Sequence, residues 1–162
     1  MKRYFVLPIL IAVVCMMCTS CKKTLTDETH NLPNATWARF EAQKFQFNVK
    51  NIDNCYHIVL TVNIDTTTYK ENTLPLVVNM TSEGGETRMF YSNIKLRDKK
   101  GKRYGDVVGN YQTASARLRS YMYFNNKGQQ NIAIKQGTSK YELPGITSVN
   151  LRVEKAKLEL PE

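Results

Sequence analysis

The sequence contains few of the residues on which enzymes and metal sites most often depend. Its 162 residues include only two histidines, and it has no Gly-x-Ser-x-Gly motif, which presents a serine nucleophile at a sharp turn. His30 lies in a polar N-terminal stretch, which leaves His57 as the only histidine of the predicted folded domain. A zinc site usually needs several histidine or cysteine ligands. We therefore expect no metal, no cofactor and no catalytic residue.

Acidic residues are also scarce, with 14 aspartates and glutamates against 23 lysines and arginines. Cleavage of a glycosidic bond normally requires two carboxylates. The candidates are Asp53, Asp65, Glu83, Glu86 and Asp106. All of them fall in predicted loops or at predicted strand ends, where acidic side chains are usually just solvated. Gly84-Gly85 predicts a hairpin turn rather than a phosphate-binding loop, because no helix follows it.

The first 21 residues have the pattern of a bacterial lipoprotein signal. Two basic residues precede an apolar run over residues 4–17, and two small residues stand directly before Cys21. The apolar run is shorter than the roughly 20 residues that a membrane-spanning helix needs. Cleavage after residue 20 would leave a cysteine with lipid on its sulfur and an acyl group on its amine. The mature chain would then be anchored to a membrane without spanning it.

Two alternatives to lipidation at Cys21 stay open. A plain secretory signal would need no cysteine at the cleavage site. Cys18 is another candidate lipid acceptor, but the bulky Met16 and Met17 precede it, where a signal peptidase requires small side chains. Cys21 is therefore the predicted lipidation site.

Maturation would also decide the redox chemistry of the chain. Cys15 and Cys18 would leave with the signal and Cys21 would carry lipid, so Cys55 would be the one remaining free thiol. No internal disulfide could then form, and stability would depend on packing. The mature chain of 142 residues is long enough for one domain with a substantial core.

We predict three segments: a signal peptide over residues 1–20, a lipidated tether over 21–36 and one folded domain over 37–162. The tether is expected because residues 24–34 are polar, contain Pro33 and show no periodicity.

The predicted domain alternates apolar and polar residues almost throughout, which is typical of β-strands with one buried face. The alternation is clearest over residues 45–49 and 56–64. The other predicted strands cover residues 74–80, 89–96, 104–108, 118–124, 131–134 and 149–160. Seven or eight short strands without a long amphipathic helix predict an all-β, antiparallel, jelly-roll-like sandwich. Two segments could depart from the strand pattern: residues 37–44 could form a short turn, and residues 111–119 would tolerate a helix.

Positive charge is concentrated in two places. Loss of the signal would lower the formal net charge from +9 to +7. Lys22-Lys23 would lie beside the lipid, where anionic headgroups attract them. The second cluster, residues 99–103, follows Asp98 and has the composition of a turn at a hairpin tip. Neither cluster is interleaved with aromatic residues, so we expect no nucleic acid partner.

A series of short motifs along the chain resembles GldH, the gliding-motility lipoprotein family of the Bacteroidetes. The motifs are Trp37, Phe45-Gln46-Phe47, Asp53-Asn54-Cys55-Tyr56, residues 69–74, residues 94–101 with Gly105 and Gly109, residues 143–146, and residues 149–155. The closing segment is the most specific. Asn150 stands where a glycine is expected, and Asn63-Ile64-Asp65 replaces an expected basic residue, as in a divergent member. The resemblance implies a non-catalytic envelope lipoprotein that is associated with motility and the neighbouring secretion machinery.

Five tyrosines suggest a contact face. Nine tyrosines, six phenylalanines and Trp37 exceed what the strand cores need. The five that gather in one part of the sequence are Tyr91, Tyr104, Tyr111, Tyr121 and Tyr123. Packing within the sandwich is one interpretation. Contact with another envelope protein is a second, and contact with a glycan is a third, since tyrosine suits both kinds of partner. The alternative function is therefore a carbohydrate-binding lipoprotein.

The residues after Cys21 bear on the location of the protein. Bacteroidetes often mark surface lipoproteins with acidic residues directly after the lipidated cysteine. Here Lys22-Lys23 come first, and Asp27-Glu28 follow only later. This order favours the periplasmic face, so we expect an outer-membrane lipoprotein that faces the periplasm. The expected partners, from the resemblance above, are other envelope proteins.

Overall fold

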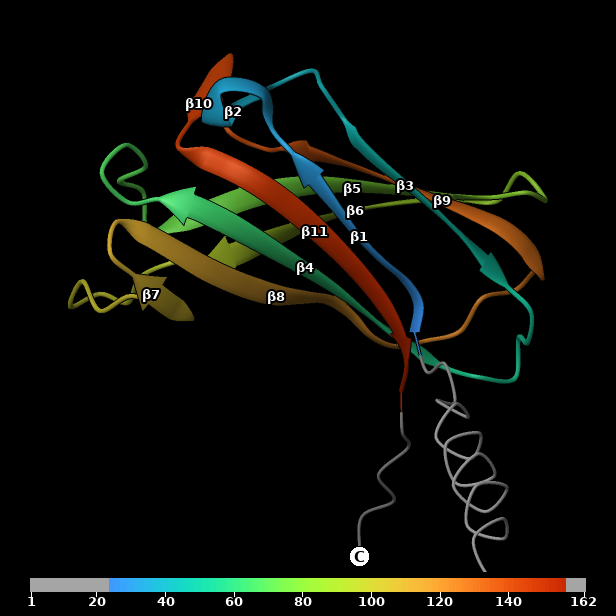
Figure 1. The fold of residues 1–162 in the computed structure, drawn as a ribbon. Coiled ribbons are helices and arrows are strands. Elements are labelled where there is room, and N and C mark those ends of the chain that lie inside the picture. The colour runs from blue at the N-terminus through green and yellow to red at the C-terminus, as the bar shows by residue number, and fades with distance from the viewer. Residues whose placement is uncertain (1–23, 157–162) are drawn as a thin grey trace, which may run out of the picture.

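The computed structural model describes residues 24–156 (Figure 1). The predicted signal peptide and Cys21 lie outside the described residues. Within residues 24–156, no helix is long and apolar enough to cross a membrane.

The described chain forms eleven strands and one short 3₁₀ turn. The strands are β1 (Thr24–Asn31), β2 (Thr36–Ala38), β3 (Gln43–Val49), β4 (Tyr56–Asp65), β5 (Thr73–Ser82), β6 (Thr87–Lys95), β7 (Asp106–Val108), β8 (Tyr111–Met122), β9 (Gly128–Gln136), β10 (Glu142–Pro144) and β11 (Ile146–Lys155). The turn, η2, covers Pro33–Ala35.

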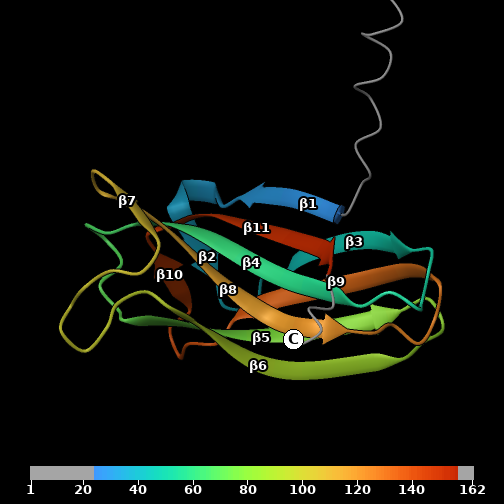
Figure 2. The same cartoon turned by 90° about the horizontal axis from the view of Figure 1, so that it is seen from below.

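These strands form a two-layered sandwich, and Figure 2 shows the two sheets one above the other. One sheet has the order β1-β11-β4-β8-β7 and the other the order β3-β9-β5-β6, while β10 and β2 pair separately. All pairs are antiparallel. If the eight long strands are numbered along the chain, the two sheets run 1-8-3-6 and 2-7-4-5. This is the strand order of a jelly roll, and the predicted fold class is confirmed.

The core lies between the two sheets and follows the predicted alternation. Every second residue of β4 is buried, from Tyr56 to Ile64, as are Phe45, Phe47 and Val49 on β3. Side chains from the inner faces of both sheets pack into one apolar cluster. Alternation is visible in these strands because one face of each packs on the core and the other does not.

The predicted tether was wrong for residues 24–31, which form β1. This strand pairs with β11 from Thr24 opposite Glu154 to Asn31 opposite Ser148. It lacks apolar alternation because polar residues, Glu28 and His30, stand opposite the buried Leu151 and Val149 of β11. The ring of His30 stacks on Phe45 with centroids 4.3 Å apart, and its Nδ1 lies 3.1 Å from Gln43 Oε1. The ordered domain therefore includes Thr24 and does not begin at Trp37.

The helix that the sequence would tolerate over residues 111–119 is absent, because these residues belong to β8. Ala114 is buried and Ala116 packs against the core, so the alanines are small residues on the inner face of a strand. The buried Gln112 donates two hydrogen bonds of 2.8 Å from Nε2, to the carbonyl oxygens of Leu96 and Tyr104. These bonds connect the start of β8 to the segment before β7.

The sandwich has two ends with different connections. Thr24, residues 50–55, the β5–β6 turn and residues 123–127 lie at one end, which we call the anchor end because it holds the first described residue. Residues 66–72 and 96–105 lie at the other, which we call the distal end. The predicted hairpin tip is at the distal end, where Asp98 Oδ1 accepts hydrogen bonds from the backbone amides of Lys100 and Lys102, both 2.8 Å.

Tyr69 provides a pH-dependent test of distal-end packing. Its side chain is 3% exposed, and its hydroxyl donates to the carbonyl oxygen of Thr73 at 2.9 Å. Burial, with a smaller contribution from the charge of Glu71, raises its pKa from 10.0 to about 12. The folded state then holds this proton more tightly than the unfolded chain, so the free energy of unfolding falls as pH rises from 10 through 12.

We expect this titration to lower the free energy of unfolding of the wild type by at most about 3 kcal/mol. Tyr69→Phe should lack this pH-dependent decrease. At pH 8 its free energy of unfolding should be only about 1 kcal/mol below that of the wild type, because one hydrogen bond is missing. Urea unfolding of both proteins between pH 8 and 12 measures the difference. Parallel loss of stability in the two proteins would contradict the assignment.

Candidate functional site

The sandwich is open along the side where β6 of one sheet faces β8 of the other (Figure 2). Within the described chain, β6 pairs with β5 alone. The outer edge of β8 is covered by β7 only at Tyr111–Thr113. The rest of the outer edge of β8 and the whole outer edge of β6 therefore have no strand partner among the described strands.

A groove lies between these two strands. Its main part has a volume of about 440 Å³ and is lined by Met80, Arg88, Met89, Phe90, Arg119, Ser120, Met122, Tyr123 and Asn125. A hollow of about 20 Å³ adjoins it and is also lined by Ser82, Glu86, Phe124, Asn126 and Gln130. We call the two together the edge groove. Its lining is amphipathic, with methionine and aromatic side chains next to arginine and amide groups.

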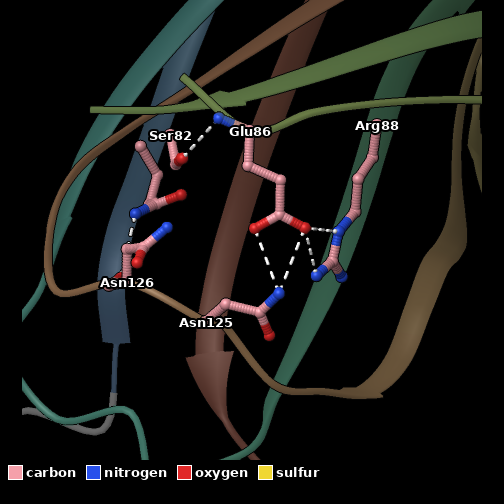
Figure 3. A network of polar contacts seen from close by, with 6 residues as sticks. Ser82, Glu86, Arg88, Asn125 and Asn126 are labelled. Atoms are coloured by element: carbon pink, nitrogen blue, oxygen red, sulfur yellow. Dashed lines mark hydrogen bonds and ion pairs between the residues drawn. The ribbon is translucent and has the colours of Figure 1, made fainter. Parts of the chain in front are cut away.

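A polar network fixes one end of the edge groove (Figure 3). Arg88 donates to Glu86 Oε1 from Nε at 2.8 Å, and its Nη2 lies 2.7 Å from the same oxygen. Asn125 Nδ2 donates to both carboxylate oxygens at 3.2 and 3.1 Å. The backbone amide of Glu86 donates to Ser82 Oγ at 3.1 Å. These contacts join the β5–β6 turn to the connection that follows β8, and so link the two sheets.

Arg119 crosses the groove from β8 to β6. Its guanidinium carbon lies 3.9 Å from the centre of the Phe90 ring, in a cation–π contact. Neither Arg119 nor the exposed Arg117 forms a salt bridge to any residue between 24 and 156. The one carboxylate that lines the groove, Glu86, is already paired with Arg88. The groove therefore carries uncompensated positive charge.

The five predicted contact tyrosines are all exposed but occupy separate places. Tyr104 and Tyr111 lie at the distal end, whereas Tyr91 is on β6 and Tyr121 is near the end of β8. Tyr123 alone lines the edge groove, and a hydrogen bond with the Cys55 thiol raises its pKa. The structure thus does not gather the five into one face, and their roles in contact stay predictions.

The groove residues that the sequence did not reveal are Met89, Phe90 and Arg119. Phe90 and Arg119 are distant in the sequence, so no local pattern connects them. One local signal was present on β6, where large side chains occupy successive positions. Arg88 and Phe90 are partly buried on one face, while Met89 and Tyr91 are 60% and 75% exposed on the other. Large apolar residues on the outer face of an edge strand are unusual unless something covers them.

The carboxylates considered from the sequence do not gather into one site. Asp65 accepts hydrogen bonds from the amide and hydroxyl of Thr67, and these bonds lower its pKa. Glu83 Oε2 accepts a 3.0 Å bond from the backbone amide of Gln129. Asp53 and Asp106 are exposed. Among the described residues, no group of three or more histidine, cysteine, aspartate or glutamate side chains could hold a metal ion.

A second hollow lies at the distal end and has a volume of about 630 Å³. It is lined by Asn72, Thr73, Lys95, Arg97, Asp98, Lys99, Lys100 and Tyr104. Arg97 anchors its wall by donating from Nη1 to the carbonyl oxygen of Lys70 at 3.1 Å. We call it the distal hollow. It places one half-exposed tyrosine beside amide, hydroxyl and charged groups.

Comparison with known proteins gives one family. The model of a family described as GldH lipoprotein matches residues 24–153. The match spans both sheets and includes β1, the strand that the tether prediction had excluded. Among curated proteins, none matches the chain.

Proposed function

The chain belongs to the GldH lipoprotein family, and from this membership we propose that it is a non-catalytic accessory or scaffold component of gliding motility or of the associated secretion machinery. A lipoprotein of this family is a membrane-anchored envelope protein. We further propose that it is attached to the outer membrane, faces the periplasm and binds other envelope proteins.

The edge groove is the observation that supports docking. Methionine, aromatic residues and arginine are enriched at the centres of protein interfaces. All three occur here, along a strand edge that no described strand covers. An edge of this kind provides backbone donors and acceptors for a partner chain.

The position of β1 limits how far the domain can stand from the membrane. Thr24 is three positions after Cys21, and three extended residues span at most about 10 Å. Lipid on Cys21 would therefore hold the anchor end close to the bilayer. The Glu86–Asn125 end of the groove would lie near the membrane, whereas Lys99 and Lys100 would point into the compartment. This placement favours a partner that is itself close to the membrane.

Cys21→Ala should abolish fatty-acid labelling and release the protein from membranes, because the thiol that accepts the lipid is gone. Metabolic labelling with a palmitate analogue and membrane fractionation measure both effects. Cys55→Ala is the matched control, since it removes the buried free thiol and leaves Cys21 in place. Labelling that persists in Cys21→Ala would contradict the predicted site.

Crosslinking in intact cells tests the scaffold function. The membranes are solubilised after crosslinking, and the proteins that co-purify with the lipidated chain are identified, with unlipidated Cys21→Ser as the control. Reproducible recovery of envelope or secretion-machinery proteins with the lipidated form alone supports a scaffold. Recovery of no protein by the folded, lipidated chain contradicts it.

Glycan binding is the second candidate, and the distal hollow favours it. Tyr104 is 46% exposed there, beside Asn72 and Thr73. A sugar can stack on an aromatic ring while its hydroxyl groups bind neighbouring polar side chains. A carbohydrate array tests this function, with Tyr104→Ala as the variant. Binding that the variant loses supports a glycan site, and an array without binding excludes the tested glycans.

A further inference from the structure

We propose that the edge groove binds an extended acidic segment of a partner envelope protein, and that this segment pairs with β6 as a fifth strand of the β3-β9-β5-β6 sheet. The proposal rests on the docking function above and specifies the chemistry of the partner.

The hydrogen-bonding pattern of β6 shows which of its backbone groups are available. The amide of Ser82 donates to the carbonyl oxygen of Glu86 at 2.9 Å, so these two residues form a hydrogen-bonded pair. Such pairs alternate along an antiparallel ladder with pairs whose backbone groups point away from each other. From the register of β5 and β6, the amides and carbonyls of Met89, Tyr91 and Asn93 point away from β5. They form a row of donors and acceptors along the edge.

The regularity of β6 makes it suitable for strand addition. Its pairing with β5 runs from Thr73 opposite Lys95 to Thr81 opposite Thr87 without a register shift, and β6 contains no proline. Natural edge strands are usually protected by bulges, prolines or covering segments. The edge strand β1 has a register shift, and β8 is partly covered by β7. β6 lacks these protections, as binding by strand addition requires.

The charges beside β6 determine what the added strand should carry. Side chains of an added strand alternate between the two faces of the sheet. On the groove side they would meet Arg119, whose charge has no carboxylate partner in residues 24–156. On the outer side they would lie next to Met89 and Tyr91. An occupant with acidic residues at every second position and apolar residues between them complements both faces.

Site-specific photo-crosslinking in intact cells tests the proposal on the full-length protein. The crosslinking amino acid replaces Asn93 on the exposed edge of β6, and the captured peptide is mapped by mass spectrometry. The control position is Asn48, an exposed residue of β3 at the opposite edge of the same sheet. We expect capture from position 93 of an envelope-protein segment with alternating acidic and apolar residues.

Two pairs of variants separate backbone pairing and charge from other kinds of contact. Tyr91→Pro removes the outward amide, whereas Tyr91→Ala removes the same side chain and keeps the amide. We expect capture to fall about tenfold more in the proline variant than in the alanine variant. Arg119→Glu should abolish capture, whereas Arg119→Lys should retain most of it. Thermal unfolding of each variant shows that it is folded.

The outcomes distinguish this proposal from the docking function itself. Equal capture by Tyr91→Pro and Tyr91→Ala, a captured segment without acidic residues, or capture of a second copy of this chain would each overturn the strand-addition proposal. Capture of envelope proteins from position 48 alone would also overturn it and leave docking standing. If neither position captures a protein, both the docking function and this proposal fail.

Discussion

A chain that begins at residue 37 should fail to fold, whereas a chain that begins at Thr24 should fold. The shorter chain lacks β1 and the buried Leu32, and it exposes the edge of β11 along the whole former β1 ladder. It also loses the His30 ring that stacks on Phe45. Burial of a leucine side chain contributes about 1.5–3 kcal/mol and each ladder hydrogen bond about 1 kcal/mol. The combined loss is on the order of 5 kcal/mol or more, which is comparable with the stability of a whole domain.

Circular dichroism and urea unfolding of the two chains measure this effect. Neither chain contains Cys21, so lipidation cannot account for a difference between them. Cooperative unfolding of the shorter chain at the same urea midpoint would show that residues 24–31 contribute no stability and would restore the tether interpretation.

Trp37→Ala should destabilise the domain by about 3–5 kcal/mol, because removal of this large buried side chain leaves a cavity. Trp37 is 0% exposed and lies on β2, opposite Leu143 of β10. Its Nε1 donates to the carbonyl oxygen of Glu41 at 3.0 Å. Trp37→Phe keeps most of the apolar volume, so it should lose less stability than the alanine variant.

Unfolding of these variants must be followed by circular dichroism, since Trp37 is the only tryptophan. Tyr141→Ala is the matched surface control, because Tyr141 lies close to β10 but is 73% exposed. We expect it to change stability by less than about 0.5 kcal/mol. A stability loss for Trp37→Ala as small as that of the control would contradict the burial of Trp37 in the core.

The sequence predicted those strands whose two faces differ in polarity. On β4, Ile58, Leu60 and Val62 face the core while their neighbours do not, so the period-two signal is strong. The signal failed on β1, where the residues opposite the buried Leu151 and Val149 are Glu28 and His30. At an open side of the sandwich, a polar residue can occupy an inner position and still reach water or a polar partner.

The candidate site was less predictable than the fold. The exposure of individual tyrosines could be anticipated, but the groove depends on contacts between distant parts of the chain. Glu86 contacts Asn125 across 39 positions, and Arg119 reaches Phe90 on another sheet. Periodicity describes one strand at a time, so it cannot show which strands face each other across an open side. That information depends on the strand order, which only the three-dimensional structure provides.

The pairing of β1 with β11 also has a consequence for biogenesis. The first strand of the domain pairs with the last, so a chain that emerges N-terminus first from a translocation channel cannot complete its five-stranded sheet until Ile146–Lys155 has emerged. Contacts between residues so distant in sequence form slowly. Until then, β1 and one edge of β4 lack their partner strand, and such unpaired strand edges are prone to aggregation. We therefore expect the emerging chain to depend on holdase chaperones until β11 is available for pairing.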